Sequence, residues 1–514
     1  MRTRVWRFAP VLVVSLLLPL GMPAPAADGV PDAAAIRAKI LAADGPLPDA
    51  FRETAETVTS SGATTVEHRF RRGKDFRTTN NTGRFHTERG SFNGELWHMN
   101  DNGQVIVDQP DPGRAAREQT TITVTPVAKP VPGYLIATLN AQGYGAKEYV
   151  DGAAWRVVRR EQIGVNGTIA TTYDDVRADH GRTFAHHAHI ENGYAHTSGD
   201  MRIVEYVPGD VPPSELAIPP PRRALVTFPP GLTSVELPAK FGRSHVYVRV
   251  NVGGRGLDFV LDSGAAGITI DATVARELGL PEYDKRSSVT AGRFTTARTI
   301  VPEMRIGPLV MRDVAVQELP HGWQTAPDVK EVGLLGFDFL AELGVTIDYE
   351  HERVAVVPSA AYVPPTDPHT IPIDVRVGSG QPRATVSVNG AVGERWILDT
   401  GGAGTFLIFD YFARRYPDAL RDRGGGDQRE RHLIGIGGAI PAKPYQIASL
   451  KLANMNFTDW VGYRVEGHGA YAQNDDGVVG VEFLRLFTLG FDYANSRVYL
   501  VPNRDGRLAM GIKE

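Results

Sequence analysis

The chain of 514 residues contains no cysteine, which excludes disulfide bonds, thiolate nucleophiles and thiolate metal sites. It also lacks an excess of positive charge, since 55 Lys and Arg stand against 59 Asp and Glu, so we expect no nucleic-acid partner. Beyond residue 26, no apolar run approaches the roughly 18 residues that a membrane-spanning helix needs. The fold must therefore rest on its hydrophobic core alone.

The composition is that of a globular protein with many turns. Hydrophobic residues make up 42% and charged residues 22% of the chain, while 55 Gly and 36 Pro are spread along it. Frequent Gly and Pro favour short strands joined by turns over long helices. The length also exceeds that of one compact domain, so the sequence predicts several domains that are mainly β.

The first 26 residues have the pattern of an export signal. Three arginines stand among the first seven residues, an apolar stretch follows over 9–20, and Ala-Pro-Ala at 24–26 provides the small residues of a cleavage site. We therefore expect residues 1–26 to be a signal peptide, with the mature protein periplasmic or secreted and free of transmembrane segments. An uncleaved N-terminal membrane anchor is the alternative.

Two proline-rich stretches divide the mature chain. They lie at 211–234 and 359–370, and proline restricts such stretches to extended conformations typical of linkers. The sequence therefore predicts a β-rich N-terminal domain at 27–210, followed by two further domains at 235–358 and 371–503.

The N-terminal domain begins with a helix. Asp32 can cap a helix that runs through a series of alanines until Gly45 ends it. Short alternating segments follow, which predict an antiparallel meander. This outline resembles the half-barrel of periplasmic lipoprotein carriers. The clearest strand segments are 64–70, 104–107, 155–160 and 201–206.

The domains at 235–358 and 371–503 are copies of one another, and we call them the first repeat and the second repeat. Twelve residues separate Gly336 from Asp348 in the first repeat, and twelve separate Gly480 from Asp492 in the second. In both repeats a proline follows ten residues after that aspartate. The alternating pattern around these positions predicts a hairpin with Asp-Tyr before its turn and Arg-Val after it.

Each repeat also contains an apolar strand that runs into an acidic turn. The first repeat has Asp-Ser-Gly at 262–264, and the second has Asp-Thr-Gly at 399–401. These tripeptides occupy equivalent places, 74 residues before Gly336 and 81 residues before Gly480 (336−262 and 480−399). The duplication therefore brings one candidate carboxylate from each repeat.

These spaced motifs resemble those of the aspartic peptidases, over about residues 226–503. The resemblance implies a mainly β fold of two duplicated lobes that pair within one chain, with Asp262 and Asp399 meeting as the catalytic pair. Two carboxylates held so close share one proton, and the pair activates a water that attacks a peptide bond. The implied activity is that of an aspartic-type endopeptidase acting on a protein or peptide substrate, without a metal or other cofactor.

The residues beside the aspartates have supporting roles by the same resemblance. The hydroxyls of Ser263 and Thr400 would reach backbone groups across the lobe interface and fix the separation of the carboxylates. Gly264 and Gly401 would let the backbone turn tightly enough for its N–H groups to support the carboxylates.

The sequence departs from the pepsin-like pattern at the third residue after each aspartate. A serine or threonine is usual there, whereas this chain has Ala265 and Gly402. Alanine matches the retropepsin-like branch, and Gly402 leaves its carboxylate with one potential donor fewer. We expect a mobile hairpin within 287–300, with Phe294 near its tip, and an equivalent loop at 435–438.

Weaker features allow simple interpretations. His187 and His189 would share one face of a strand at a spacing that suits zinc or copper, but a solvated strand is favoured because no partner has ligand spacing. Asp475 and Asp476 are interpreted as a solvated turn. The histidine-rich segment as a whole contains His180, His186, His187, His189 and His196.

Two functional classes stay open from the sequence. The first is an exported endopeptidase. The second is a catalytically inert aspartic-peptidase-like protein that acts as an envelope ligand- or protein-binding module. The presence of both aspartates favours the first, because an inert fold has no need of the pair. Arg222 and Arg223 also mark a point in the linker where a propeptide could be removed.

Overall fold

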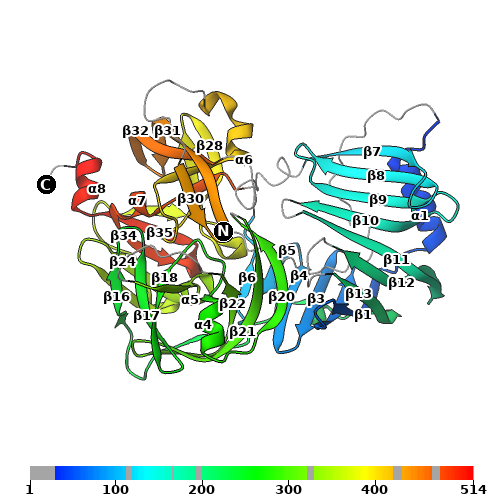
Figure 1. Ribbon diagram of the computed structural model, residues 1–514, viewed down its shortest axis with the longest axis horizontal. Helices are drawn as coiled ribbons and strands as arrows, with labels where there is room; N and C mark the ends of the chain where they lie inside the picture. Colours follow the sequence, from blue (N-terminus) through cyan, green and yellow to red (C-terminus); the bar gives the residue numbers. More distant parts are fainter. Residues whose placement is uncertain are drawn as a thin grey trace. The chain divides into compact units, whose positions relative to one another are not determined.

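The computed structural model describes residues 29–110, 119–164, 167–191, 198–290, 292–320, 329–420, 431–465 and 475–512 (Figure 1). The predicted signal peptide lies outside the described residues. Strands account for 57% and helices for 12% of the structure, so the prediction of a mainly β fold is confirmed. The chain divides into two compact units on either side of residue 220, except that residues 284–287 group with the first unit.

The first unit is built on one antiparallel sheet of consecutive strands. Within the described residues the spatial order is β6-β5-β4-β3-β2-β1-β13-β12-β11-β10-β9-β8-β7. The chain therefore meanders outward from β1 to β6 and then, from β7 at the opposite edge, meanders back to β13, which pairs with β1. This confirms the predicted antiparallel meander. The strands are β1 Ala50–Thr59, β2 Thr64–Arg72, β3 Asp75–Thr82, β4 Phe85–Phe92, β5 Glu95–Met99, β6 Val105–Val107, β7 Thr120–Val127, β8 Gly133–Asn140, β9 Gly145–Asp151, β10 Arg156–Gly164, β11 Gly167–Asp179, β12 Arg182–Glu191 and β13 Gly199–Pro208.

The predicted helix is α1, Ala33–Asp44. The Asp32 side chain accepts a hydrogen bond from the backbone N–H of Ala35 at 2.7 Å, and Gly45 ends the helix with a positive φ of 80°. Ile36 and Ile40 of the helix pack against apolar residues of β8 and β9. A second, short helix in this unit is α3, Pro213–Leu216, within the proline-rich stretch.

The described residues of the second unit form three sheets. The strands of the first repeat's sheet are β14 Val226–Thr227, β16 Ala239–Phe241, β17 Val246–Val252, β18 Arg255–Leu261, β19 Thr269–Asp271, β20 Tyr283–Val289, β21 Arg293–Ile306, β22 Leu309–Leu319 and β23 Glu331–Leu335. Those of the second repeat's sheet are β27 Arg383–Val388, β28 Ala391–Leu398, β29 Phe406–Phe409, β30 Arg431–Gly435, β31 Gly438–Leu452, β32 Met455–Val465 and β33 Gly477–Val479. The α-helices described in the second unit are α4 Ala272–Glu277, α5 Phe337–Leu340, α6 Asp410–Arg415, α7 Val481–Leu484 and α8 Arg504–Ala509.

The third sheet of this unit takes strands from both repeats. Its order is β15-β25-β24-β34-β35-β26, with β15 Val235–Glu236, β24 Leu343–Asp348, β25 Arg353–Pro358, β26 Ile371–Asp374, β34 Phe487–Asp492 and β35 Arg497–Pro502. The two predicted hairpins are confirmed, since Asp348 pairs with Arg353 and Asp492 pairs with Arg497. Strands β24 and β34 pair antiparallel, so the hairpins of the two repeats form one continuous sheet.

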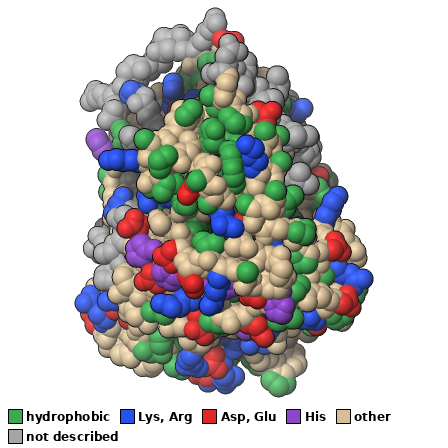
Figure 2. All heavy atoms as spheres, turned by 90° about the vertical axis from the view of Figure 1, so that its right-hand side faces the viewer, with side chains coloured by type: hydrophobic (Ala, Val, Ile, Leu, Met, Phe, Trp, Pro, Cys, Tyr) green, Lys and Arg blue, Asp and Glu red, His purple; other side chains and the backbone are tan. Residues whose placement is uncertain are grey.

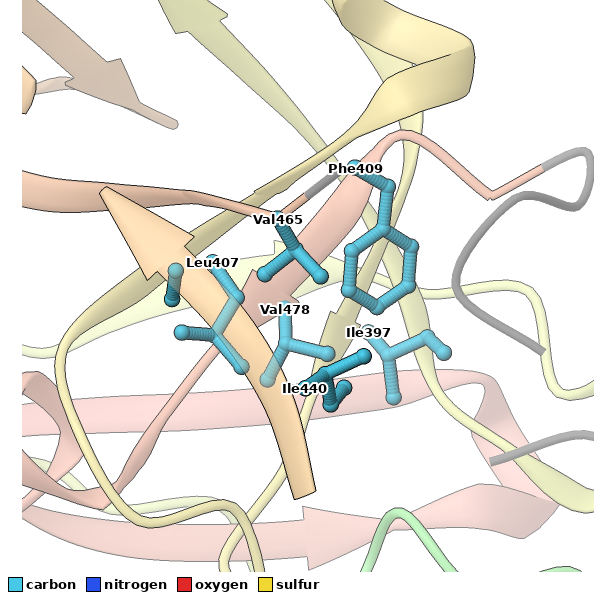
Figure 3. Packing of buried hydrophobic residues seen from close by; sticks show 7 residues of the cluster. Ile397, Leu407, Phe409, Ile440, Val465 and Val478 are labelled. Atoms are coloured by element: carbon cyan, nitrogen blue, oxygen red, sulfur yellow. The ribbon is translucent and has the colours of Figure 1, made fainter. Parts of the chain in front are cut away.

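The core of the second repeat lies between strands that are distant in sequence. Figure 3 shows Ile397, Leu407 and Val478 with Ile440 and Val465 as one packed group. These residues come from β28, β29, β33, β31 and β32, so burying them fixes the strands around the loop that follows β28. Among the described residues, no helix is long and apolar enough to cross a membrane.

Candidate active site

Equivalent strand pairs position the two acidic turns. Asp262 follows β18, which lies parallel to β23, and Asp399 follows β28, which lies parallel to β33. The backbone N–H of Asp262 donates to the Leu335 carbonyl at 3.0 Å, and that of Asp399 donates to the Val479 carbonyl at 2.9 Å. Each aspartate is therefore held by the last residue of the parallel partner strand.

Four reciprocal hydrogen bonds join the two acidic turns. The Ser263 N–H donates to the Thr400 hydroxyl oxygen, and the Thr400 N–H donates to the Ser263 hydroxyl oxygen, both at 3.0 Å. Each hydroxyl then donates to a carbonyl of the opposite turn, Ser263 to Leu398 at 2.8 Å and Thr400 to Leu261 at 2.7 Å. Because both side chains are buried, water cannot compete for these bonds.

The glycines of the two turns support the carboxylates in two ways. The N–H of Gly264 donates to Asp262 Oδ1 at 2.8 Å, and the N–H of Gly401 donates to Asp399 Oδ1 at 2.9 Å. Each glycine also packs against the aspartate of the other turn. A Cβ added at Gly264 would lie 2.3 Å from Asp399 Cγ, and one added at Gly401 would lie 2.3 Å from Asp262 Cγ. Only glycine fits at these two positions.

The two carboxyl groups are buried and interact directly. Asp262 is 8% and Asp399 9% exposed. Burial raises the pKa of the Asp262 carboxyl well above its usual range, and the neighbouring charge of Asp399, to which it is hydrogen-bonded, raises that pKa further. The same surroundings raise the pKa of the buried Tyr493 phenol, first through burial and then through the two aspartates. The arrangement thus favours one shared proton between two carboxylates.

Two further glycines, which directly follow β23 and β33, let the acidic turns pack closely against the ends of these strands. A Cβ at Gly336 would lie 2.5 Å from the Ala265 carbonyl oxygen, and one at Gly480 would lie 2.7 Å from the Gly402 carbonyl oxygen. Gly402 itself is confined by the site, because its own Cβ would lie 2.9 Å from Asp399 Oδ2. The departure from serine or threonine at this position therefore matches the space that the carboxylate leaves.

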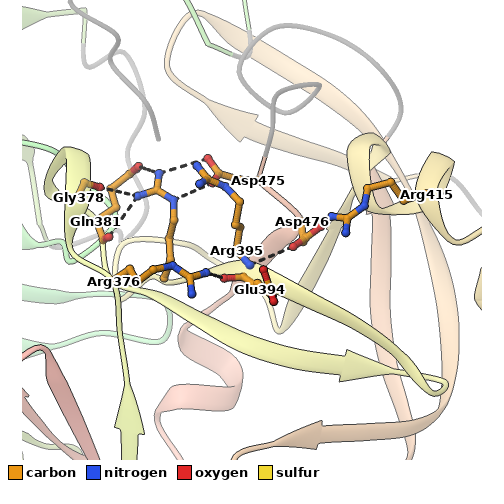
Figure 4. Close-up of polar contacts among 9 residues, drawn as sticks. Arg376, Gly378, Gln381, Glu394, Arg395, Arg415, Asp475 and Asp476 are labelled. Carbon is orange, nitrogen blue, oxygen red and sulfur yellow. Dashed lines mark hydrogen bonds and ion pairs between the residues drawn. The ribbon is translucent and has the colours of Figure 1, made fainter. Parts of the chain in front are cut away.

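The pair Asp475 and Asp476 was predicted to be a solvated turn, and this prediction is wrong. Both side chains are buried, and both bind arginines of the second repeat (Figure 4). Asp475 Oδ1 lies 2.7 Å from Arg383 Nε and 3.1 Å from Arg395 Nη2, while Asp476 Oδ1 lies 3.2 Å from Arg415 Nη1. Burial raises the pKa of Asp476 to about 6, against the opposing effect of the Arg415 charge.

The sequence offered one indication of this network that was overlooked. Asp475 and Asp476 come directly before the apolar strand β33, and Arg383 stands within the alternating apolar strand β27. Charged residues within apolar strands are buried only when they are paired. The partners are 92 residues apart, however, so the sequence alone does not reveal which charge meets which.

The two expected loops are hairpin turns that touch each other. One joins β20 to β21 and the other joins β30 to β31, as the predicted positions require. The Thr290 hydroxyl donates to the Ile436 carbonyl, and a Cβ at Gly292 would lie 2.0 Å from the Gly437 carbonyl oxygen. Phe294, expected near the tip, is the second residue of β21 and packs with Ile436 in a buried cluster.

The histidine-rich strand β12 lies in the first unit. His187 Nδ1 is 2.5 Å from Asp174 Oδ1 and His189 Nδ1 is 2.9 Å from Asp200 Oδ1, so aspartates of the neighbouring strands pair with both rings. His196 lies outside the described residues. On the face drawn in Figure 2, histidine, acidic and basic side chains are interspersed. Among the residues that the structure describes, no group of three His, Asp or Glu could hold a metal ion.

The linker arginine at the predicted processing point is engaged. Arg223 donates to the carbonyls of Arg312 and Asp313 at 2.8 and 2.6 Å. Two residues later, the Leu225 N–H donates to the Glu342 carboxylate. The segment that begins the second unit is therefore bound to the first repeat over these residues.

Comparison with protein families matches part of the sequence. Residues 248–339 match the protein family described as Aspartyl protease, so this region, which includes Asp262, is aspartic-protease-like. The match ends before Asp399. No curated protein matches the chain.

Solved structures resemble parts of the chain at low identity. An aspartic proteinase from Irpex lacteus is 14% identical, covering 54% of this chain and 99% of its own, with a TM-score of 0.32. Conglutin gamma from lupine seeds is 9% identical, covering 56% of this chain and 97% of its own, with a TM-score of 0.30. A LolA superfamily protein from Nitrosomonas europaea is 11% identical, covering 37% of this chain and 98% of its own, with a TM-score of 0.28.

Proposed function

We propose that this protein is an exported aspartic endopeptidase whose catalytic pair is Asp262 and Asp399. The observation that carries the proposal is the set of four reciprocal hydrogen bonds between Ser263 and Thr400 and the opposite turns. Bonds of this kind serve to hold two carboxyl groups at one fixed separation, and two buried carboxylates kept together are destabilising unless they share a proton. A pair of buried carboxyl groups held in this way is the arrangement that the proposed catalysis needs.

The proposed reaction begins with the pair singly protonated. Burial beside Asp399 raises the pKa of Asp262, so we assign the shared proton to Asp262 and the role of general base to Asp399. Asp399 removes a proton from a bound water, whose oxygen attacks the carbonyl carbon of the peptide bond, while Asp262 gives its proton to the carbonyl oxygen. The C–N bond of the tetrahedral intermediate then breaks as Asp399 gives its proton to the leaving amine and Asp262 takes a proton back from one hydroxyl of the diol. This releases the carboxylic acid and the amine and restores the singly protonated pair. The acid and base roles of the two residues are thus exchanged between the attack of water and the breaking of the C–N bond.

The remaining parts of the proposal concern the surroundings of this pair. Residues 1–26 serve as the signal peptide, and the mature protein is periplasmic or secreted. The two repeats, 235–358 and 371–503, act as the lobes of one peptidase, and 27–210 forms a separate β-rich domain. The substrate is a protein or peptide, and the contacting turns that include Thr290 and Ile436 separate to admit it.

The test is cleavage of a mixed peptide library between about pH 3 and 7, which brackets the singly protonated pair. We expect the full mature chain to cleave and both Asp262→Asn and Asp399→Asn to lose cleavage. Asp258→Asn is the matched control, because Asp258 is a buried aspartate of β18 that binds Arg249 at 2.8 Å. Cleavage that survives either active-site substitution contradicts the mechanism. If the unsubstituted chain cleaves no peptide at any pH, the inert binding module becomes the better proposal.

A further inference from the structure

A second pair of side chains crosses between the two repeats and reaches the acidic turns. His245 Nε2 lies 3.0 Å from the Gly401 carbonyl oxygen, and Gln381 Nε2 donates to the Gly264 carbonyl oxygen at 2.6 Å. Both side chains are buried, with His245 6% and Gln381 0% exposed. Each repeat thus directs one side-chain nitrogen at the catalytic-turn glycine of the other.

The two residues occupy equivalent positions in the repeats. Tyr247 of β17 pairs with Val260, two residues before Asp262. Arg383 of β27 pairs with Ile397, two residues before Asp399. His245 and Gln381 each precede these paired residues by two positions. Their equivalence therefore follows from the strand register, although neither the residue types nor the spacing to the aspartates is the same.

The donor and acceptor atoms are fixed by their partners. A backbone carbonyl oxygen only accepts, so the proton of His245 that faces Gly401 is on Nε2. Gln381 Oε1 accepts from Arg383 Nη2 at 2.8 Å, and an arginine only donates, so the amide N–H group of Gln381 must face Gly264. Both contacts are therefore hydrogen bonds from side chain to backbone carbonyl.

The buried ion pair of the second repeat holds Gln381 in place. Arg383 binds the Asp475 carboxylate through Nε and Nη2, and Arg383 Nη1 also donates to the Gly378 carbonyl at 2.9 Å (Figure 4). Around His245 the support is different. The N–H of Gly242 donates to the His245 carbonyl at 2.9 Å, and the ring of Tyr247 lies 6.0 Å from the imidazole in an edge-on contact.

We propose that His245 and Gln381 are positioning residues for the catalytic pair. Each anchors the carbonyl of the glycine whose own N–H binds the carboxylate of the same turn, Gly401 for Asp399 and Gly264 for Asp262. Glycine restrains its own backbone little, so a turn that depends on glycine needs anchors on both of its peptide groups. The role of His245 and Gln381 in catalysis rests on the proposed peptidase function.

The consequence for Asp262 has a definite direction. The Gly264 N–H is a hydrogen-bond donor that lowers the pKa of Asp262 against the larger effects of burial and of Asp399. When Gln381 is replaced by a residue without a donor, the Gly264 carbonyl is no longer anchored. The hydrogen bond from the Gly264 N–H to Asp262 then weakens, and we expect the pKa of Asp262 to rise further. A misplacement of about 1 Å in a catalytic group can lower a rate by around a hundredfold.

The experiment compares Gln381→Met and His245→Leu with His245→Gln in the full mature chain. Methionine keeps the length of glutamine but has no donor, whereas glutamine at 245 restores one. We expect Gln381→Met and His245→Leu to lower kcat at least tenfold with little change in KM, and His245→Gln to keep most of the activity. Gln317→Met is the matched control, since the amide of Gln317 donates to the Thr296 hydroxyl and not to an acidic turn.

A second readout does not depend on peptidase activity. In protein labelled with ¹³C at the aspartate carboxyl carbons, NMR titration follows Asp262 directly, and we expect its midpoint to move to higher pH in Gln381→Met but not in Gln317→Met. If the chain cleaves nothing yet this midpoint moves, the positioning role stands and only the peptidase function fails. An unchanged kcat, or a midpoint that does not move in a folded Gln381→Met variant, overturns the proposal. If Gln381→Met does not fold, Gln381→His takes its place. Because histidine retains a donor, we then expect a kcat near that of the unsubstituted chain. A loss of kcat of tenfold or more in Gln381→His overturns the proposal.

Discussion

Ser263 and Thr400 exchange hydrogen bonds symmetrically, each N–H donating to the hydroxyl oxygen of the other at 3.0 Å. The two residues are 137 positions apart in the chain and are both 1% exposed. Neither hydroxyl has water as an alternative partner, so removing one leaves buried backbone groups without hydrogen bonds. The separation of the two aspartates therefore depends on both residues at once.

Replacing Thr400 with valine tests this dependence. Valine has nearly the shape of threonine but no hydroxyl, so the Ser263 N–H and the Leu261 carbonyl lose their partner. With about 1–3 kcal/mol for each of these two buried unsatisfied groups, we expect the free energy of unfolding to fall by about 2–6 kcal/mol in urea denaturation. Thr400→Ser keeps the hydroxyl and serves as the control. Equal stability of the two variants would contradict the role given to the hydroxyl.

The raised pKa of Asp262 predicts a pH-dependent gain in stability for Asp262→Asn. Above the ordinary value of 3.8 the unfolded chain releases this proton, while the folded protein retains it until its raised pKa is reached. The folded state thus binds more protons in this window, and its stability falls as pH rises. Asparagine does not titrate, so its advantage over aspartate should be small near pH 3 and grow towards pH 7.

Urea midpoints measured at several pH values, with the unsubstituted chain alongside, check this prediction. A difference between the two proteins that is constant with pH is the contrary result. It would mean that the carboxyl of Asp262 titrates alike in the folded and unfolded states.

The buried ion pair of the second repeat predicts a large loss of stability for Asp475→Asn. The substitution leaves the charges of Arg383 and Arg395 in a buried site without their carboxylate. Breaking a buried pair in this way costs about 3–5 kcal/mol, which unfolding in urea would measure. Glu236→Gln is the control, because Glu236 pairs with Arg353 where both side chains are more than half exposed, and we expect a change below about 1 kcal/mol. Similar losses in both variants would show that burial of the pair does not matter.

Gly264→Ala should abolish cleavage while the fold persists. The new Cβ would lie 2.3 Å from Asp399 Cγ, so the carboxyl must move. A displacement of that size is expected to reduce kcat by about a hundredfold or more. At Gly256 the three atoms nearest to an added Cβ belong to the guanidinium of Arg249, the end of a flexible side chain. Gly256→Ala should accordingly retain activity, and peptide cleavage with circular dichroism of both variants would decide between the two effects.

Much of the second unit could be predicted because its sequence motifs occur twice, once in each repeat. The hairpins whose first strands end at Asp348 and Asp492, and the turns at Asp262 and Asp399, were each expected from matching spacings, and repetition excludes chance. The helix α1 was predictable for a local reason, since Asp32 and Gly45 are strong helix boundaries. Signals of these kinds depend on neighbouring residues or on a regular interval, which a single sequence contains.

The features that escaped prediction depend on partners distant in sequence. Asp475 and Asp476 stand before a glycine, as in a turn. Only the folded chain shows that both are buried and that they bind arginines 61 to 92 positions away. His245 and Gln381 gave no local pattern at all. Their importance arises from a contact with the opposite repeat, and no spacing within either repeat records it.

The continuous sheet formed by β24 and β34 has a consequence for the two halves of the second unit. Cut apart, each half would expose an unpaired strand edge, and such edges seek a partner of the same kind. The two halves of this single chain therefore pair as two subunits of a dimer would, but they are covalently linked. Two identical subunits must carry every substitution twice, whereas tied halves can differ. This chain has a histidine where its other half has a glutamine, and a serine where the other half has a threonine, so the two halves carry different residues at equivalent positions, which two identical subunits could not do.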